Sequence, residues 1–383
     1  MQDSIFELTN RELGLLEKFD EFCQSRVAPF CKEWDCDERI PRDVFLECGR
    51  VGLLGLIAPL EIGGQALSMV AFSKAISLVT SYYPSLGFDL SVQNSLGVGH
   101  ILQFGSESQC AAFLPNQIKG ETLAGWALTE PEAGSDAGSL GSNATNLNGC
   151  WRISGQKMFT TQGANADFLI VISGSGTTDT GKKEISSFVV LKNEFEIVRV
   201  LPTLGMRGSD STLIKLSESK AELIGKRGSG LKQSLFMLDR ARVGMASVSI
   251  GIGKAALSHA TSYSKNRQQF GKPISNFQSI QNLLVDSAID IESGELLTLK
   301  AAKLLDQGHD RTPMASSMAK LFASEAATRT SNRCLQVFGG RGYLRDFPME
   351  QYYRDAKFCE IGEGTSEIQK IIIARELLKR DVS

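Results

Sequence analysis

Phe168-Leu-Ile-Val-Ile172, a short apolar run in the middle of the chain, decides the fold class together with a second run of the same kind, Ser187-Phe-Val-Val-Leu191. Both runs are rich in β-branched and aromatic residues, and clusters of Gly, Asn, Ser and Thr at 141–149 and 173–181 separate them from their neighbours. Short runs between turn-forming clusters are typical of β-strands. Residues 120–225 are therefore predicted to form an antiparallel β domain of short strands.

Helical spacing flanks this β domain on both sides. Before it, Leu15, Phe19 and Phe22 recur at steps of four and three residues, and after Gly230 the same period returns and holds. Alternating strand and helix units are absent, which disfavours a doubly wound nucleotide-binding fold. We expect an α+β, mostly α protein with an N-terminal helical domain (1–119), the β domain (120–225) and a C-terminal four-helix bundle (226–383).

The composition excludes several classes of protein. Among 383 residues, 41 Lys and Arg nearly balance 43 Asp and Glu, so the surplus of positive charge that nucleic-acid binding needs is missing. The N-terminal residues are polar and acidic, unlike a signal peptide, and no apolar run is long enough to span a bilayer. We expect no nucleic-acid partner and no membrane association.

The cysteines and histidines give no sign of a metal site. The eight cysteines form no Cys-x-x-Cys pair, and the three histidines, His100, His259 and His309, have no Cys or carboxylate nearby at ligand spacing. The same arrangement argues against a histidine-based catalytic triad. Scattered, reduced thiols are typical of a cytoplasmic protein, which is the location we expect.

Two glycine clusters have partial similarity to phosphate-binding loops. Gly251-Ile-Gly253-Lys254 has Val248 where a Walker A loop needs Gly and Ala255 where it needs Ser or Thr, so it is interpreted as a site of close helix packing. Gly339-Gly340-Arg341-Gly342 follows an apolar helical stretch and suits a helix C-cap and turn. Its backbone amides would also be able to approach a phosphate, and the residues alone leave both interpretations open.

Three segments, in order along the chain, carry a resemblance to a known family. The first is Thr129-Glu-Pro-Glu-Ala-Gly-Ser-Asp136, and the second is Arg267-Gln-Gln-Phe-Gly271, followed by Gln278. The third runs from Gln336-Val-Phe-Gly-Gly340 through Arg354-Asp-Ala-Lys357 to Glu363-Gly-Thr-Ser-Glu-Ile-Gln369. In their order and spacing, these segments resemble the acyl-CoA dehydrogenase family over essentially the whole chain.

The resemblance implies FAD as the cofactor, lying between the β domain and the C-terminal helices. Trp126, Leu128 and Thr129 would run along the isoalloxazine ring, and Thr161 would form a hydrogen bond near its N5 atom. Phe159 stands where many relatives carry Trp, and its apolar face still suits the ring. Without the family pattern, Thr161 would be interpreted as an ordinary strand residue.

The resemblance also implies that a second copy of the chain completes the cofactor site. Arg267 and Phe270, with Gln336 and Gly340, resemble residues that reach the FAD of a neighbouring subunit. Arg267 suits the pyrophosphate because its planar guanidinium can donate two parallel hydrogen bonds. A homo-oligomer, in the form of a tetramer, is therefore expected. The further cofactor contacts that we expect are Ser135, Phe277, Gln278, Gly339, Thr365 and Glu367.

Glu363 is the expected catalytic base. Dehydrogenation of an acyl thioester needs a carboxylate to take the weakly acidic α-proton while hydrogen-bond donors hold the thioester oxygen. The resemblance implies that the Glu363 N–H is one of these donors. Relatives that carry the base on another helix have Glu at the position of Ala241, whereas this chain has Ala there and keeps Glu363. The expected substrate contacts are Ser135, Asp239, Arg242 and Gly364. By themselves, Asp239 and Arg242 would also suit an exposed helical pair.

The residues after Glu363 predict a loop just ahead of a helix. Ser366 and Gln369 fit a Ser-x-x-Gln capping box, and an apolar helix face follows them. The dipole of this helix would favour the Glu363 anion, whereas burial against a flavin and an acyl chain would raise the pKa of Glu363. The sequence does not decide which effect is larger.

Gly362 gives the best indication of substrate shape. Relatives specialised for straight chains often carry Tyr just before the base, so Gly at this position is expected to widen the site near the α and β carbons. We expect a short, branched or substituted acyl group on CoA or, alternatively, on an acyl-carrier protein, with an electron-transfer flavoprotein as electron acceptor. A direct oxidase and a non-catalytic scaffold of the same fold are competing hypotheses, and the intact Glu363 and flavin segments oppose the scaffold.

Overall fold

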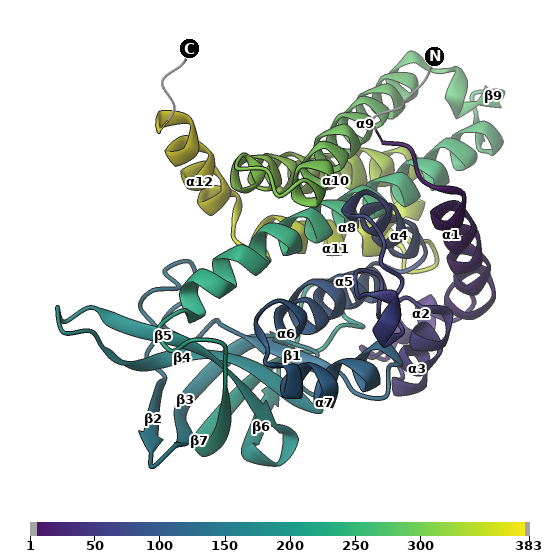
Figure 1. The fold of residues 1–383 in the computed structure, drawn as a ribbon. Helices are drawn as coiled ribbons and strands as arrows, with labels where there is room; N and C mark the ends of the chain where they lie inside the picture. The colour runs from purple at the N-terminus through teal and green to yellow at the C-terminus, as the bar shows by residue number, and fades with distance from the viewer. Residues whose placement is uncertain (1–5, 380–383) are drawn as a thin grey trace.

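The computed structural model describes residues 6–379, which form N-terminal helices, a β-sheet and long C-terminal helices in that order (Figure 1). The predicted α+β class is thereby confirmed. Capping boxes start two of the N-terminal helices, with Thr9 and Glu12 before α1 and Ser106 and Gln109 before α7. The N-terminal elements are α1 (Asn10–Phe22), η1 (Cys23–Val27), α2 (Cys31–Cys36), α3 (Arg42–Val51), η2 (Leu60–Ile62), α4 (Met69–Tyr82), α5 (Pro84–Val92), η3 (Gln93–Val98), α6 (Gly99–Phe104) and α7 (Glu107–Ile118).

The middle part is a seven-stranded sheet with the order β1-β3-β2-β4-β5-β7-β6. Its elements are β1 (Ala124–Ala127), β2 (Asn143–Leu147), β3 (Cys150–Thr161), β4 (Phe168–Thr177), β5 (Lys183–Leu191), η4 (Lys192–Glu194), β6 (Phe195–Val200) and β7 (Ser211–Ile224). Most pairings are antiparallel, as predicted, but β1 runs parallel to β4, with Ala124 opposite Phe168. Because β1 and β4 are separated by two strands in the sequence, no local turn signal reveals their relative direction.

Strand length is a second correction to the prediction. β3 and β7 span 12 and 14 residues and are not short. Bulges interrupt their pairing between Ile153 and Gly155 and between Lys157 and Thr160. A bulge bends a strand without ending it, so residues that suggest a turn can lie inside a continuous strand.

The central strand β4 explains why the run from Phe168 to Ile172 is apolar at every position. Phe168 and Ile170 pack on one face of the sheet with residues of α6 and α7, and Leu169 and Val171 pack on the other face with Phe188. Since successive side chains of a strand point to opposite faces, a strand buried on both faces needs apolar residues throughout. The N-terminal helices therefore cover one face of the sheet (Figure 1).

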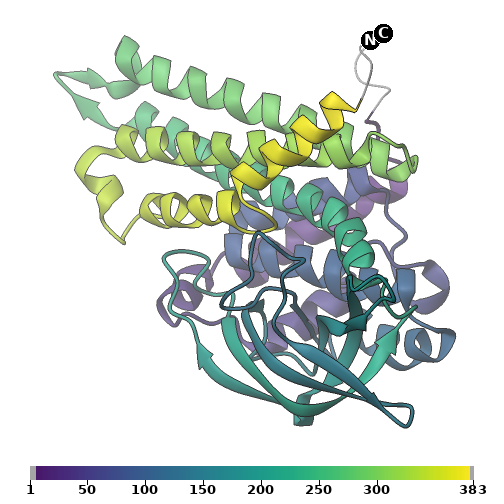
Figure 2. The same ribbon diagram turned by 90° about the vertical axis from the view of Figure 1, so that its left-hand side faces the viewer.

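Long helices build the C-terminal part, in which α8, α9, α10 and α11 pack together and α12, in yellow, crosses in front of α10 (Figure 2). The elements are α8 (Gly230–Asn266), β8 (Gln268–Gln269), β9 (Lys272–Pro273), η5 (Ile274–Asn276), α9 (Gln278–Asp306), α10 (Thr312–Phe338), η6 (Gly339–Tyr343), α11 (Met349–Ile361) and α12 (Ser366–Leu378). A Cβ at Gly251 would stand 2.5 Å from the Ser77 carbonyl oxygen, and one at Gly253 would overlap Ile291. Both glycines therefore allow close helix packing, as predicted.

Across residues 6–379, no helix combines the length and apolar character needed to cross a bilayer. The same residues contain no group of three side chains suited to hold a metal ion.

Candidate functional site

Glu363 lies in the short loop that joins α11 to α12. Its backbone has a left-handed φ of 57°, and the next residue, Gly364, has a φ of 91°. Such a backbone is costly for a residue with a side chain, and it is found most often at functional sites whose surroundings enforce it. Within residues 6–379, no carbonyl accepts a hydrogen bond from the Glu363 N–H. This donor is therefore available to a substrate oxygen.

The predicted capping box of Ser366 and Gln369 was wrong. Thr365 is the N-cap of α12, its hydroxyl accepts a hydrogen bond from the first turn, and Ser366 is the buried first helical residue. Gln369 instead donates to the carbonyl oxygens of Glu363 (3.2 Å) and Gly364 (2.8 Å). The left-handed loop turns these two carbonyls toward α12, where they need donors, and this turn of the backbone is not visible in the sequence.

Burial influences the pKa of Glu363 more strongly than the nearby positive charges do. Desolvation raises the pKa of Glu363 to about 7, against the charges of Lys320 and Arg242, which lower it. The residue as a whole is half-buried, so it keeps some contact with solvent. A carboxylate that is about half ionised at neutral pH is suited to accept a proton and to release it again.

Asp239 and Arg242 form a buried ion pair, and not the exposed pair that their spacing alone suggests. The guanidinium donates to Asp239 Oδ1 over 2.7 Å, and the Ser316 hydroxyl donates to the same oxygen over 3.1 Å. The Arg242 and Asp239 side chains are only 5% and 14% exposed. Burial lowers the pKa of Arg242, while the charges of Asp239 and Glu363 raise it. Arg242 is thus close enough to Glu363 for their charges to interact.

Lys320 belongs to this site and was missed by the sequence analysis. It lies on α10 with its side chain fully buried, and its ammonium donates to the Gly364 carbonyl over 2.7 Å. Burial lowers the pKa of Lys320 to about 8. The sequence contains one signal that would have found it, since Lys320 is the lone charged residue in the small and apolar stretch 314–324.

The two predicted flavin segments lie side by side in the sheet. Trp126 of β1 is opposite Thr161 of β3, and the Met158 N–H donates to the Thr129 carbonyl over 2.8 Å. Phe159 lies at a bulge of β3 with a left-handed φ of 57°, and it is 59% exposed. An aromatic ring held exposed on a strained backbone suits a flat aromatic ligand, so these residues fit FAD.

Lys157, which was also not predicted from the sequence, connects backbone segments next to the predicted flavin contacts. It is fully buried, pairs with Glu130 Oε1 over 2.6 Å, and donates to the carbonyl oxygens of Leu128 (3.0 Å) and Ile172 (2.6 Å). Burial lowers the pKa of Lys157 to about 8, while Glu130 raises it. These bonds hold the Leu128 carbonyl before Thr129 and the Glu130 side chain after it, and Thr129 is a predicted cofactor contact.

The residues predicted to reach a second subunit lie together at the end of the C-terminal helices that is far from the sheet. In Figures 1 and 2 the hairpin β8–β9 lies far from the sheet, and Phe270 at its tip is 92% exposed. Tyr263 and Phe338 stack with ring centroids 4.0 Å apart, which brings the ends of α8 and α10 together. The group at this end comprises Arg267, Phe270, Phe277, Gln278, Gln336, Gly339 and Gly340. One copy of the chain therefore keeps this group away from its own flavin segments.

The remaining predicted contacts are accessible from solvent. Gly339 is the C-cap of α10, as predicted, with a φ of 58°. No atom lies within 4 Å of where a Cβ would stand at Gly339 or Gly340, so a ligand can approach this backbone closely. Ser135 is exposed in the loop after β1, and Glu367 is exposed in the first turn of α12.

Gly362 does not leave the open space that the missing Tyr ring suggested. A Cβ at Gly362 would lie 2.9 Å from Phe358 Cζ and 3.1 Å from Met245 Cε. Phe358 packs edge-on against Phe88, with ring centroids 4.8 Å apart. Because Phe358 precedes Gly362 by one helical turn, its ring covers the glycine backbone. Neither Phe358 nor Met245 belongs to a recognisable motif, so neither residue was predicted to lie at the site.

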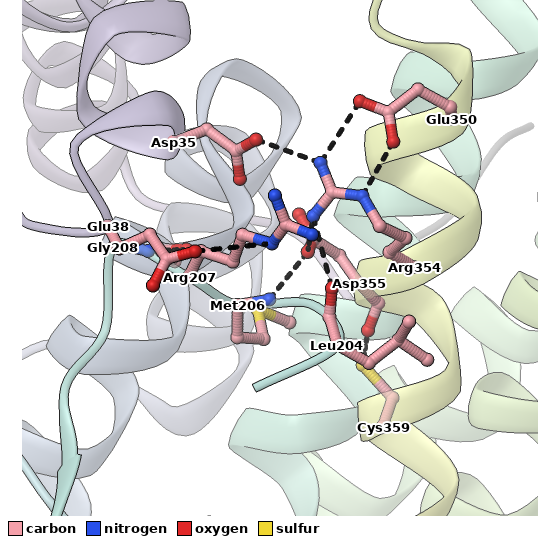
Figure 3. Close-up of polar contacts among 11 residues, drawn as sticks. Asp35, Glu38, Leu204, Met206, Arg207, Gly208, Glu350, Arg354, Asp355 and Cys359 are labelled. Carbon is pink, nitrogen blue, oxygen red and sulfur yellow. Dashed lines mark hydrogen bonds and ion pairs between the residues drawn. The ribbon is translucent and has the colours of Figure 1, made fainter. Parts of the chain in front are cut away.

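A buried cluster of charges fixes the helix that leads to Glu363 (Figure 3). Arg354 of α11 donates to Asp35 of α2 (2.8 Å) and to Glu350 (2.6 Å), and the Met206 N–H donates to Asp355 (2.6 Å). Burial raises the pKa of Asp355 to about 7, against the Met206 bond and the charge of Arg354. The cluster joins the N-terminal helices and the loop before β7 to α11, and so it positions the loop that follows α11.

Comparisons with known proteins find relatives over the full length of the chain. Family models described as the N-terminal, middle and C-terminal domains of acyl-CoA dehydrogenase match residues 9–121, 125–218 and 228–378. An acyl-CoA dehydrogenase of Bacillus subtilis (strain 168) is 36% identical, over 97% of this chain and 99% of that protein. The mitochondrial short-chain specific acyl-CoA dehydrogenase of Rattus norvegicus is also 36% identical, over 97% of this chain and 91% of that protein. The structure of butyryl-CoA dehydrogenase from Megasphaera elsdenii matches with a TM-score of 0.94 and 31% identity, over 99% of this chain and 100% of that chain.

Proposed function

This chain belongs to the acyl-CoA dehydrogenase family, and we propose that it converts a short-chain acyl-CoA to the 2-enoyl-CoA with Glu363 as the base. Members of this family are FAD-dependent oxidoreductases that act on CH–CH bonds. The observation that carries the proposal is the environment of Glu363. Its carboxyl group has a pKa of about 7 and lies in a left-handed loop near two cations.

In the proposed reaction, Glu363 removes the α-proton of the thioester. The electrons of that C–H bond form the α,β double bond as the β-hydrogen leaves with its electron pair. FAD, when bound, supplies the acceptor for this hydride. The Glu363 N–H, which has no carbonyl acceptor within residues 6–379, can bond the thioester oxygen and stabilise the negative charge that develops there. Arg242 and Lys320 favour the ionised form of the base before the proton is taken.

The proposed acyl group is short and unbranched, and the filled space beside the base supports the absence of a branch. Phe358 and Met245 occupy the region that a side chain at Gly362 would take, so the absence of a Tyr ring does not by itself widen the site. A branched or substituted acyl group would require Phe358 to move. The short-chain specificity in the name of the rat relative, and the butyryl group in that of the Megasphaera enzyme, support the same proposal.

A substrate screen by flavin bleaching tests this proposal. The holoenzyme is mixed anaerobically with butyryl-, octanoyl-, palmitoyl- and isobutyryl-CoA, and butyryl-CoA is expected to bleach the flavin fastest. Fastest bleaching by isobutyryl-CoA would support the branched substrate, and no bleaching by any acyl-CoA would overturn the function. The butyryl group on an acyl-carrier protein, measured in parallel, distinguishes the two thioester handles.

Phe358→Ala is expected to raise kcat/KM for isobutyryl-CoA relative to butyryl-CoA by about tenfold or more. Removal of the ring opens the space beside Gly362, and a hydrophobic pocket distinguishes ligands that differ by one methylene by roughly 10- to 200-fold. Tyr353→Ala is the matched control, because it removes a 47% exposed aromatic ring from the same helix. If the ratio is the same in the two variants, Phe358 does not limit the acyl group.

We infer that two copies of the chain complete each cofactor site within a cytoplasmic tetramer. The group around Arg267 and Phe270 lies away from the flavin segments of its own sheet. On α9, the apolar residues Val285, Ile289 and Leu296 share one helix face and are 55%, 60% and 50% exposed, which suits burial against another copy. A monomeric holoenzyme in a light-scattering measurement would contradict this assembly.

An electron-transfer flavoprotein is the proposed electron acceptor. Stoichiometric release of peroxide in air would contradict this acceptor.

A further inference from the structure

The ammonium of Lys320 is a buried charge with an unusual partner. Its side chain has no exposed surface, and it donates to a backbone carbonyl, that of Gly364, over 2.7 Å. The buried Lys157, by contrast, pairs directly with the Glu130 carboxylate over 2.6 Å. Burial of a charge is costly unless an opposite charge compensates it. The position of Lys320 therefore requires a nearby anion.

The groups around Lys320 come from α8, α11 and the loop after α11. Burial has the largest effect on the pKa of Lys320, and it lowers this pKa. The groups Cys359, Glu363 and Glu360 raise the pKa, whereas the charge of Arg242 lowers it. Burial raises the pKa of Cys359 to about 12, so this thiol is neutral at physiological pH.

Two of the charged groups near Lys320, Arg242 and Glu360, already have partners of opposite charge. Asp239 compensates Arg242 over 2.7 Å, and Lys357 compensates Glu360 over 2.6 Å. Among the charged groups named here, Glu363 is therefore the carboxylate that remains to compensate Lys320.

Lys320 also holds the backbone of the loop. Its hydrogen bond goes to the residue directly after the base, and Gln369 donates to the same carbonyl oxygen over 2.8 Å. Gln369 donates in addition to the Glu363 carbonyl over 3.2 Å. Donors from two helices thus restrain the Gly364–Thr365 peptide, and Gln369 alone restrains the Glu363–Gly364 peptide. The left-handed backbone of Glu363 and Gly364 needs such restraint.

We propose that Lys320 is a positioning residue for the base, whose ammonium orients the Gly364–Thr365 peptide and stabilises the Glu363 carboxylate. Lys320 acts through the loop and through its charge, without contact with the substrate. This inference rests on the proposed function, in which Glu363 takes the α-proton.

Lys320→Met tests the charge. Loss of a nearby positive charge raises the pKa of Glu363, so a smaller fraction of the base is ionised at neutral pH. The acid limb of the kcat–pH profile is expected to move toward alkaline pH by roughly one unit. At a pH below that limb, kcat is expected to fall roughly tenfold. Lys320→Arg keeps the charge, and its acid limb is expected to stay at the wild-type pH.

Two further variants separate charge from geometry. Gln369→Leu removes a donor to the same carbonyl without a change of charge, so it is expected to lower kcat at every pH without moving the acid limb. Ala326→Gly places a flexible residue at a buried position of α10 and serves as the control for a loosened helix. Its acid limb is expected to match the wild type even if its unfolding temperature falls.

A readout without turnover completes the test. Difference infrared titration follows the Glu363 carboxyl group, with Glu363→Gln identifying its band, and the band is expected to titrate at higher pH in Lys320→Met. An unshifted band in that variant would overturn the inference. If Lys320→Met does not fold, Lys320→Gln is compared with Lys320→Arg, and equal titrations of these two would overturn it as well. If wild-type enzyme fails to bleach with any acyl-CoA, the proposed function is overturned, whereas the infrared comparison still tests the effect of Lys320 on Glu363.

Discussion

Glu363→Gln is expected to remain yellow, with bound FAD, and to lose acyl-CoA oxidation by roughly a thousandfold or more. The amide has the size of the carboxyl group but cannot accept the α-proton, and a positioned general base contributes about 10²–10⁴-fold to such a step. The loop should keep its shape, because its restraints from Lys320 and Gln369 reach backbone carbonyls and not the Glu363 side chain. The measurement is the rate of flavin bleaching at matched FAD content.

The control for this variant is Glu325→Gln. Glu325 lies on α10 and pairs with Lys370 over 3.7 Å, with both side chains partly exposed. It is expected to bleach at the wild-type rate. If Glu363→Gln bleaches as fast as this control, Glu363 is not the base, and the assignment of the active site has to be abandoned.

Arg354→Met is expected to lower the free energy of unfolding by about 3–5 kcal/mol, the usual cost of removing one partner from a buried ion pair. The substitution leaves Asp35, Glu350 and Asp355 without the guanidinium that lies among them, at 2.8, 2.6 and 4.0 Å. The Arg354 side chain is 10% exposed, so water cannot replace it well. Denaturant unfolding of the FAD-loaded protein measures the loss.

An exposed ion pair gives the comparison for this result. Arg26 pairs with Glu47 over 2.7 Å, and its side chain is 41% exposed. Arg26→Met is expected to cost about 1 kcal/mol or less, because solvent screens exposed charges. Equal losses in the two variants would mean that the cluster in Figure 3 contributes no more than a surface pair.

The order of the structural parts was predictable from the sequence because it depends on local patterns. Helical spacing before and after the apolar runs near Phe168 and Phe188 was enough for the helix–strand–helix order. The parallel pairing of β1 with β4 and the bulge at Phe159 were not predictable, because both depend on strands that are distant in sequence. The N-cap at Thr365 was misplaced by one residue for a related reason. Several capping residues occur in succession there, and the backbone of the loop selects among them.

By itself, the sequence determined that Glu363 lies in a loop just ahead of a helix, that Ala occupies the alternative base position at 241, and that the flavin segments at 126–129 and 159–161 precede both. These are statements about residue type and order, which the chain carries directly. Only the tertiary structure decided that Lys320 and Arg242 lie near Glu363, that Phe358 fills the space beside Gly362, and that burial raises the pKa of the base to about 7. A pKa and a pocket shape depend on which groups surround an atom, and here those groups come from α8, α10 and α11, which only folding brings together.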